Sequence, residues 1–456
     1  MPTYERESQI FAPAPKVFEW HTRPGAFQRL TPPWEKITVL KAEGVRDGDE
    51  VHFQTQIGPF HTTWLARHKD YIEGRQFVDE QVRGPFVRWV HTHKVIPEIN
   101  STCLMKDRID YEIPLGQNKG WVARWVERRL DRLFRFRHER LQNDFKRLTF
   151  PPTRPQRVLV TGASGLIGKA LSAFLSTAGH EVWDLVRRPA RPGKREIRWD
   201  SMNRRIDRDA LEGFDAVVHL AGESIAAGRW NLKRKTAIRQ SRVDATRFLS
   251  ENLASLTKPP KVLLCASAIG FYGDRGGEEL TEKSQQGAGF LPDVCAEWEK
   301  AAEPASRAGI RVVHVRTGIV LNLAGGALPQ MALPFSLGLG GVIGSGAQWM
   351  SWITLEDLIG IYYFLLVRDN LSGVFNAAAP GAVTNRDFTK ALGHVLNRPT
   401  VFPLPAFAVK LLFGEMGKRL LLEGQKVIPE RLQKEGFEFF YPELTSALRF
   451  EMGRFL

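Results

Sequence analysis

The stretch from Arg157 to Leu171, RVLVTGASGLIGKAL, constrains the fold of this chain more than any other segment. Its apolar residues 158–160 predict a short buried parallel strand, and the residues after the last glycine have helical spacing. Between strand and helix, Gly162 permits a tight turn, Gly165 lets a phosphate approach the backbone, and Gly168 lets the helix pack on its strand. The helix start adds unpaired N–H groups and a partial positive charge. The stretch therefore predicts a dinucleotide-binding turn in a parallel sheet.

The strand predicted at 180–186 ends in Arg187 and Arg188. Sheets that use NAD commonly carry an acidic residue there for the ribose hydroxyls, whereas arginine suits a 2′-phosphate. The sequence therefore predicts that the cofactor is NADP, bound as NADPH, rather than NAD. Asp200 ends the next strand and is either an adenine contact or a turn residue. The predicted cofactor-binding residues are Gly162, Ser164, Gly165, Leu166, Ile167, Gly168, Arg187, Arg188, Asp200, Leu220, Ala221, Gly222, Glu223 and Arg242.

Length and composition limit the class of protein. At 456 residues the chain exceeds one typical core, so two or three domains are expected. The net charge of +14 concentrates in arginine-rich stretches at 124–147, 187–208 and 229–242, which solvated helix faces and phosphate-binding loops explain without nucleic acid. The three cysteines fit neither a zinc motif nor a disulfide framework, and no apolar run is long enough to span a bilayer. A cytoplasmic location is expected.

Residues 3–147 have the pattern of a separate α+β domain. A strand at 4–11 and a short helix after Pro13 precede several strand-like runs, and a long amphipathic helix at 121–148 closes the region. Its polar face carries Arg128, Arg132, Arg135 and His138. The runs that predict an antiparallel meander are 37–42, 50–57, 61–71, 76–82, 87–96 and 101–113.

This order of elements resembles the START-like, polyketide cyclase-like (SRPBCC) helix-grip family, in which the sheet wraps the last helix around an apolar cavity. The resemblance implies an apolar small ligand. The aromatic residues that either line that pocket or fill the core are Trp34, Phe53, Phe60, Trp64, Phe86 and Trp89. Four histidines alternate along the strands without a carboxylate at ligand spacing, so no metal site is predicted: His61, His68, His91 and His93.

A proline-rich segment, PPTRP at 151–155, cannot continue a helix and predicts a stiff linker over 151–156. The predicted organisation is a helix-grip domain at 1–150, a Rossmann domain at 157–400 and a small C-terminal extension at 401–456. The fold class is therefore a doubly wound α/β sheet preceded by an α+β domain.

Six further motifs occur in order after the linker. They are TGASGLIG at 161–168, LAGE at 220–223, an RW…K…SR pattern at 229–242, SAIGFYG at 267–273, GGAL…GLGG at 325–341 and QWMSWI at 348–353. Together they resemble the extended and atypical short-chain dehydrogenase/reductase group, in its epimerase-like branch with a small C-terminal extension. The resemblance covers residues 157–450 and implies a nicotinamide cofactor.

Active members of that superfamily use a Ser or Thr with Tyr-x-x-x-Lys as the acid–base set. Here Leu291 and Cys295 occupy the places of the tyrosine and the lysine, so standard tyrosine chemistry is not predicted. Tyr272 and Ser267 are the predicted catalytic residues. The alternative proton donors are Glu223, Asp293 and Cys295, while Lys235, Ser241 and Arg242 either bind phosphate or form surface ion pairs.

Two hypotheses follow for function. The first is an NADP(H)-dependent oxidoreductase or nucleoside-diphosphate-sugar epimerase-like isomerase acting on a small-molecule substrate. The second is a non-catalytic NADP(H)-binding sensor or assembly factor, with the missing Tyr-x-x-x-Lys as its signature.

Overall fold

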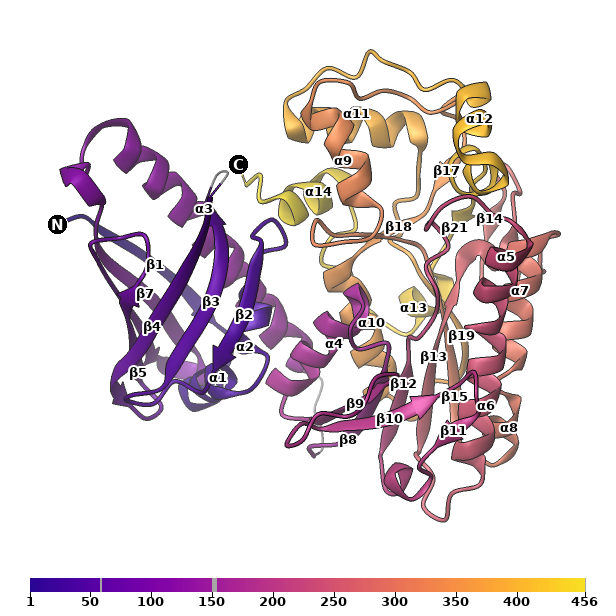
Figure 1. Ribbon diagram of the computed structural model, residues 1–456, viewed down its shortest axis with the longest axis horizontal. Helices are drawn as coiled ribbons and strands as arrows, with labels where there is room; N and C mark the ends of the chain where they lie inside the picture. The colour runs from indigo at the N-terminus through magenta and orange to yellow at the C-terminus, as the bar shows by residue number, and fades with distance from the viewer. Residues whose placement is uncertain (58–59, 150–153, 456) are drawn as a thin grey trace. The chain divides into compact units, whose positions relative to one another are not determined.

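The computed structural model describes residues 1–57, 60–149 and 154–455, except the side chains of Ile57 and Phe60 (Figure 1). The chain forms two compact units, one of residues 1–151, 176–179 and 452–456, the other of residues 152–175 and 180–451. Residues 151–153 of the predicted linker lie outside the described residues.

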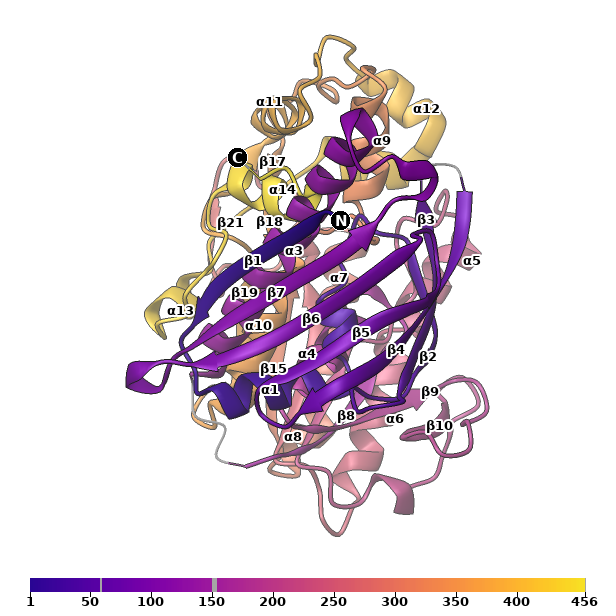
Figure 2. The same cartoon turned by 90° about the vertical axis from the view of Figure 1, so that its left-hand side faces the viewer.

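The first unit is a seven-stranded antiparallel sheet with one long helix across its inner face (Figure 2). Strands β2 to β7 form the predicted meander, and β1 pairs with β7, in the order β1-β7-β6-β5-β4-β3-β2. The strands are β1 (Thr3–Ile10), β2 (Ile37–Ala42), β3 (Glu50–Ile57), β4 (Phe60–Ile72), β5 (Gln76–Arg83), β6 (Arg88–Pro97) and β7 (Cys103–Glu112). The helices are α1 (Ala14–Thr22), α2 (Ala26–Arg29) and α3 (Gly120–Leu148), with short turns at Ile99–Ser101 and Pro114–Gly116.

Helix α3 buries the predicted apolar stripe, including Val126, Phe134 and Phe145, against the sheet. One expectation for its polar face is wrong. His138 is buried at 2% exposure, because its ring bonds to the carboxylate of Asp107 on β7 instead of facing water. Aromatic side chains pack together near one end of the sheet, where Phe53 and Trp64 stack at 5.7 Å and Trp64 and Trp89 meet edge to face at 5.1 Å.

The second unit is an eight-stranded sheet in the order β11-β10-β9-β8-β12-β13-β15-β19, parallel except for β11. From β10 to β15 this is the Rossmann order 3-2-1-4-5-6. Helices α4 and α10 lie on one face, and α6, α7 and α8 on the other (Figure 1). The strands are β8 (Arg157–Thr161), β9 (Glu181–Val186), β10 (Glu196–Asp200), β11 (Arg205–Ile206), β12 (Ala216–His219), β13 (Val262–Ala268), β15 (Arg311–Thr317) and β19 (Gly373–Ala377). The predicted doubly wound α/β fold and the helix-grip fold are both confirmed.

Helices of the second unit are α4 (Leu166–Thr177), α5 (Leu232–Gln240), α6 (Val243–Ala254), α7 (Phe290–Lys300), α8 (Glu303–Arg307), α9 (Leu328–Ser336), α10 (Leu355–Val367), α11 (Asn385–Leu396), α12 (Ala406–Gly417), α13 (Glu430–Lys434) and α14 (Leu444–Met452). Short helical turns occur at Asp209–Leu211, Ile269–Tyr272 and Lys418–Leu422. Two-stranded pairs join β14 (Glu279–Leu280) to β21 (Lys426–Val427), β16 (Ile319–Leu321) to β18 (Trp352–Thr354), and β17 (Trp349–Met350) to β20 (Val383–Thr384).

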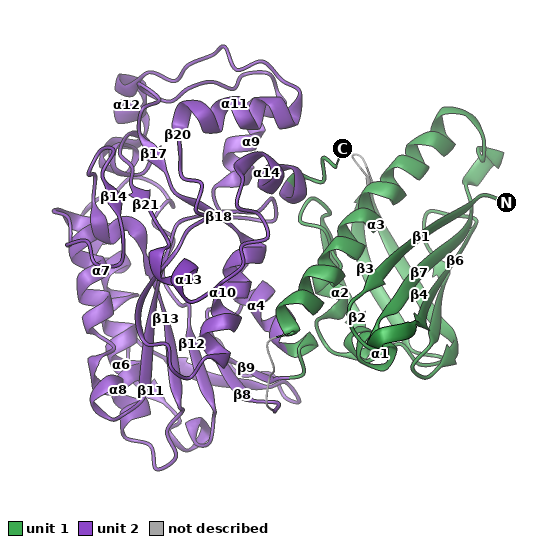
Figure 3. Cartoon of the chain, turned by 180° about the vertical axis from the view of Figure 1, so that it is seen from behind, with its two compact units in different colours: residues 1–151, 176–179, 452–456 green, residues 152–175, 180–451 purple. Residues whose placement is uncertain are grey.

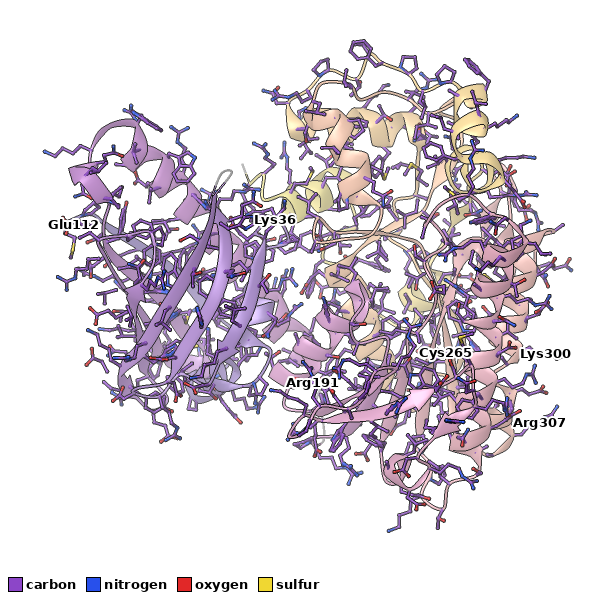
Figure 4. The ribbon with its side chains drawn as sticks, in the orientation of Figure 1. Lys36, Glu112, Arg191, Cys265, Lys300 and Arg307 are labelled. Atoms are coloured by element: carbon purple, nitrogen blue, oxygen red, sulfur yellow. The ribbon has the colours of Figure 1, made fainter. Side chains whose placement is uncertain are left out.

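The C-terminal residues up to Glu451 belong to the second unit (Figure 3). The β14–β21 pair ties them to the rest of that unit, and Met416 packs with Trp230 and Ile238. Cys265 lies inside the parallel sheet of the same unit (Figure 4) and is fully buried. Within the described residues, no helix is both long enough and apolar enough to cross a membrane.

Candidate dinucleotide site

The glycine turn between β8 and α4 has the geometry that its sequence predicts. Gly162 has φ +70°, and a Cβ there would lie 2.8 Å from the backbone of Leu220. A Cβ on Gly168 would lie 2.3 Å from the Gly162 carbonyl oxygen, so helix and strand pack without space for a side chain. Ser164 and Gly165 stay exposed at the start of α4, where helical N–H groups have no partner within the helix. The turn can therefore receive a phosphate from the solvent side.

A buried chain of hydrogen bonds holds the ends of β8 and β12 together. Thr161 Oγ1 accepts from the backbone N–H groups of Leu220 and Ala221, both at 3.1 Å. The hydroxyl must then donate to His219 Nδ1 at 2.7 Å, which places the ring proton on Nε2, 2.9 Å from Thr246 Oγ1. This chain fixes the Leu220–Ala221 backbone beside Gly162.

Because His219 must stay neutral in this chain, its burial predicts a pH dependence. Burial lowers the pKa of His219 from 6.5 to about 4. The unfolded state takes up a proton below pH 6.5 and the folded state does not, so stability is complete above pH 6.5 and falls by about 3 kcal/mol towards pH 4. Urea unfolding of the second unit at pH 7 and pH 4 measures this loss. The His219→Gln variant should lose about 3 kcal/mol less between the two values, and equal losses in both proteins would contradict the assignment.

The two arginines after β9 have different surroundings. Arg188 donates to both oxygens of Glu196 at 2.6 and 2.7 Å, and Arg191 joins the same carboxylate. Hydrogen bonds from Arg188 and Arg191 hold the pKa of Glu196 well below its usual range. Arg187 is 78% exposed, and its guanidinium approaches Glu223 at 3.7 Å. The structure therefore leaves Arg187 as the accessible cation, while Arg188 is engaged in an ion pair that the sequence pattern did not reveal.

Asp200 acts as a turn residue, which was one of its two predicted roles. Its carboxylate accepts from the backbone and side-chain N–H groups of Asn203, at 3.1 and 2.8 Å. Arg242, by contrast, lies against the segment after β12, because a Cβ on Gly222 would lie 3.4 Å from its guanidinium carbon. The structure thus brings Leu220 and Ala221 to the glycine turn, and Arg242 to Gly222, the residue that follows them.

Ser241 and Lys235, predicted either to bind phosphate or to form surface ion pairs, have structural contacts. Ser241 Oγ accepts from the backbone N–H of Glu223 at 3.1 Å and so anchors the residues after β12. Lys235 pairs with Glu415 of the C-terminal extension at 2.6 Å. Of its two predicted roles, the ion pair is the one that the contacts show.

The structure buries Tyr272 and Ser267, the two predicted catalytic residues. Tyr272 has no exposed surface and donates from Oη to Asn376 at 2.7 Å, and its burial raises its pKa. Ser267 donates to Glu299 at 2.6 Å. Arg316 joins the two, since it contacts both oxygens of Glu299 at 2.7 and 2.8 Å and donates to Tyr272 Oη at 3.0 Å.

The network formed by Ser267, Tyr272, Glu299, Arg316 and Asn376 was not predicted as a unit. Its strand members are direct neighbours in the sheet, since Ser267 pairs with Arg316 and Arg316 with Asn376. No local sequence motif carries this register. The network is largely buried and its polar groups pair with one another, so its side chains stabilise the sheet.

Helix α7 places its remaining candidates on opposite faces. Leu291 and Cys295 face Gly270, as the alignment with Tyr-x-x-x-Lys implies, and burial raises the pKa of Cys295 to about 12. Asp293 projects from the other face and accepts from Gln286 at 3.0 Å. Of the five predicted proton donors, Glu223 is the one that is both partly exposed and close in sequence to Leu220 and Ala221, which lie against Gly162.

Comparison with known proteins agrees with this architecture. The family model described as NAD dependent epimerase/dehydratase matches residues 158–378, a domain of unknown function matches 404–451, and polyketide cyclase/dehydrase and lipid transport matches 10–136. An epimerase family protein of Mycobacterium tuberculosis is 43% identical over 297 residues, which are 65% of this chain and 98% of that protein. The human epimerase family protein SDR39U1 is 40% identical over 296 residues, or 64% and 98% of the two chains.

Two solved structures extend the comparison. The nucleoside-diphosphate sugar epimerase of Corynebacterium glutamicum is 35% identical, covers 99% of this chain and 90% of its own, and has a TM-score of 0.80. Human SDR39U1, crystallised with NADPH, is 38% identical, covers 64% of this chain and 98% of its own, and has a TM-score of 0.60. The chain therefore belongs to the epimerase family of SDR39U1-like proteins, here with a C-terminal extension and an N-terminal domain of the polyketide cyclase and lipid transport type.

Proposed function

We propose that this chain binds NADP(H) at the glycine turn and uses it as an oxidoreductase or epimerase on a small molecule. The observation that carries the proposal is the turn itself. Gly162 and Gly168 leave no space for a Cβ, while Ser164 and Gly165 are open to solvent at a helix start. The NADPH in the SDR39U1 crystal structure supports the same cofactor, and the name of the Corynebacterium relative favours a nucleoside-diphosphate sugar as substrate.

A bound nicotinamide supplies hydride transfer. The protein's own part is to hold and orient that group: the first N–H groups of α4 would hold the pyrophosphate, and Arg187, 78% exposed and 3.7 Å from Glu223, would pair with a 2′-phosphate. Glu223, held at 3.5 Å from Arg234 and 3.7 Å from Arg187, is the acid that we assign to proton transfer. This assignment replaces Tyr272 and Ser267.

The Arg187→Ala variant should bind NADPH about 10- to 100-fold more weakly, because it loses one charge-assisted contact with the 2′-phosphate. Its affinity for NADH should stay the same. Isothermal titration calorimetry with both nucleotides measures this. Arg195→Ala is the matched control, since Arg195 is also exposed and its ion pair with Glu181 is similarly long, at 3.9 Å. An equal loss for NADPH and NADH would exclude Arg187 as the phosphate contact.

A non-catalytic NADP(H) sensor is the second candidate. Two observations favour it. Leu291 occupies the superfamily's usual tyrosine position, and Tyr272, the tyrosine of the nearby loop, is buried and bonded to Asn376. The two functions separate in a screen of nucleotide sugars followed by NADPH fluorescence, which detects net oxidation, and by chromatography of the sugar, which detects epimerisation without net change of the nicotinamide. An enzyme should oxidise NADPH or convert a sugar and lose that activity in Glu223→Gln, whereas a sensor should show no turnover with any sugar.

We also propose a reducing compartment such as the cytoplasm, because Cys103, Cys265 and Cys295 are all free and buried. For the N-terminal domain we propose a small apolar ligand near the aromatic cluster of Phe53, Trp64, Phe86 and Trp89. Phe53, Trp64 and Phe86 are only half-buried, which leaves aromatic surface available.

A further inference from the structure

A layer of buried polar side chains interrupts the core of the first unit. On helix α3, Phe134 belongs to one apolar cluster and Leu141 to another, and His138 lies between them. Strands β6 and β7 repeat this pattern, with apolar residues of one cluster at each end. The buried polar residues between the clusters are His91 and His93 on β6, Asp107 on β7 and His138 on α3. Polar groups in such a position cost stability unless they are paired, so the layer requires an explanation.

Two carboxylates flank the two imidazoles of β6. Asp79 Oδ2 on β5 lies 3.1 Å from His91 Nδ1 and 3.2 Å from His93 Nε2. Asp107 Oδ1 on β7 lies 3.0 Å from His91 Nε2 and 2.6 Å from His93 Nδ1. The expectation that no carboxylate accompanies these histidines is therefore wrong, because strand pairing places Asp79 opposite His91 and Asp107 opposite His93.

Hydrogen bonds between these groups do not account for the arrangement. Two of the four contacts are hydrogen bonds, from His91 Nε2 to Asp107 and from His93 Nε2 to Asp79. Two neutral imidazoles have no further N–H groups for the other two contacts. Two imidazolium ions would repel each other, since the ring centroids of His91 and His93 are 3.7 Å apart. His93 Nδ1 is buried without an aligned hydrogen bond to any described residue, although Asp107 is 2.6 Å away. A cation beside Asp79 would resolve this. The ring nitrogens that face Asp79 would direct their lone pairs at the cation, and the other ring nitrogen of each histidine would carry an N–H group directed at Asp107.

The spacing of the Asp79 side suits a metal ion. One oxygen of Asp79 and one nitrogen from each of His91 and His93 all lie within 4.8 Å of one another. With bonds of about 2.0–2.1 Å, neighbouring ligand atoms lie about 2.9 Å apart in an octahedral site and about 3.3 Å apart in a tetrahedral one. The observed 3.1 and 3.2 Å fall between these values. Asp79 is 19% exposed, which gives an ion a way in from solvent.

A second set of contacts would orient the ligands. Asp107 Oδ2 is 2.7 Å from His138 Nε2, and His138 Nδ1 is 2.8 Å from Ser8 Oγ. Asp107 therefore bridges the histidines of β6 to the long helix. Ligating histidines almost always have their other ring nitrogen bound to such a carboxylate.

We propose that Asp79, His91 and His93 bind a divalent transition-metal ion, Zn²⁺ or Fe²⁺, within the helix-grip domain. Asp107 and His138 position the two histidines. Two imidazoles and one carboxylate suit both ions and leave coordination positions for water or a ligand. This site belongs to the first unit alone and is independent of the dinucleotide site.

The test uses the full chain, stripped with a chelator and titrated with Co²⁺, with Zn²⁺ and, without oxygen, with Fe²⁺. We expect one ion per chain at micromolar affinity or tighter and a visible Co²⁺ spectrum typical of nitrogen and oxygen ligands. Asp79→Asn should weaken binding by more than about 100-fold, and Asp107→Asn by about 10- to 100-fold. His52→Gln is the control, because His52 is a strand histidine on β3, which β4 separates from Asp79 on β5. Circular dichroism confirms that each variant is folded.

Competition between Zn²⁺ and Fe²⁺ identifies the preferred ion, and either result supports the site. Wild-type protein that takes up none of the three ions at micromolar concentration overturns the proposal. Binding that survives Asp79→Asn in folded protein also overturns it. The Co²⁺ spectrum of the wild-type protein keeps the test decisive if the variants do not fold.

Discussion

Gly168→Ala is expected to destabilise the second unit by about 3 kcal/mol or more and to reduce NADPH affinity by about 100-fold. The new Cβ would lie 2.3 Å from the Gly162 carbonyl oxygen and 2.7 Å from Ala163 Cα. Both are backbone atoms, so no change of side-chain rotamer can relieve the clash. Helix α4 must then move away from β8, and the glycine turn moves with it. Urea unfolding and calorimetry measure the two effects. Gly276→Ala is the control: Gly276 has φ +56° but no heavy atom within 4 Å, so strain alone should cost about 1 kcal/mol.

A substitution at Gly165 separates binding from folding. A Cβ on Gly165 would lie 3.3 Å from the Gly162 carbonyl oxygen, and the residue is exposed. Gly165→Ala should therefore change the unfolding free energy by less than about 1 kcal/mol while it weakens NADPH binding by at least about 10-fold. Unchanged affinity in this variant would mean that the phosphate does not approach the turn at Gly165.

The second large effect is expected at Glu299. Glu299→Ala leaves the guanidinium of Arg316, which is 4% exposed, without its carboxylate partner. Removing one member of a buried ion pair costs about 3–5 kcal/mol, because the other charge stays desolvated. Ser267 would lose its hydrogen-bond acceptor at the same time. The free energy of unfolding from urea titration measures the loss.

Glu297, two residues earlier on α7, provides the matched control. It pairs with Arg239 at 2.6 Å, but the two side chains are 35% and 58% exposed. An exposed ion pair contributes at most about 1 kcal/mol, so Glu297→Ala should have a small effect. Similar losses for the two variants would show that the buried network does not carry the stability that we assign to it.

The sequence predicted most of the fold because its signals are local. The turn at Gly162 to Gly168 requires strand, tight turn and helix in that order, and the alternating runs at 37–113 predict an antiparallel sheet. The apolar stripe of α3 likewise shows which side packs on the sheet. His138 was assigned to the wrong face because its burial depends on Asp107, a partner on another strand.

The parts of the site that were missed all depend on strand register. Nothing near Ser267 in the sequence indicates that Arg316 lies beside it. The sequence also does not show that Arg188, unlike Arg187 before it, is engaged by Glu196. Tyr272 resembled a catalytic residue because it follows a strand end, but whether such a side chain points inward depends on tertiary packing. Motif spacing identifies the cofactor turn, whereas proton donors must be assigned in three dimensions.

The central claim is that the glycine turn binds NADP(H), and calorimetric titration of the purified full chain with NADPH and NADH tests it most directly. The account predicts tight binding of NADPH, weaker binding of NADH, a loss for both in Gly165→Ala, and a loss for NADPH alone in Arg187→Ala. Folded wild-type protein that binds neither nucleotide would contradict both the enzyme and the sensor. The chain would then have kept the Rossmann fold without its cofactor.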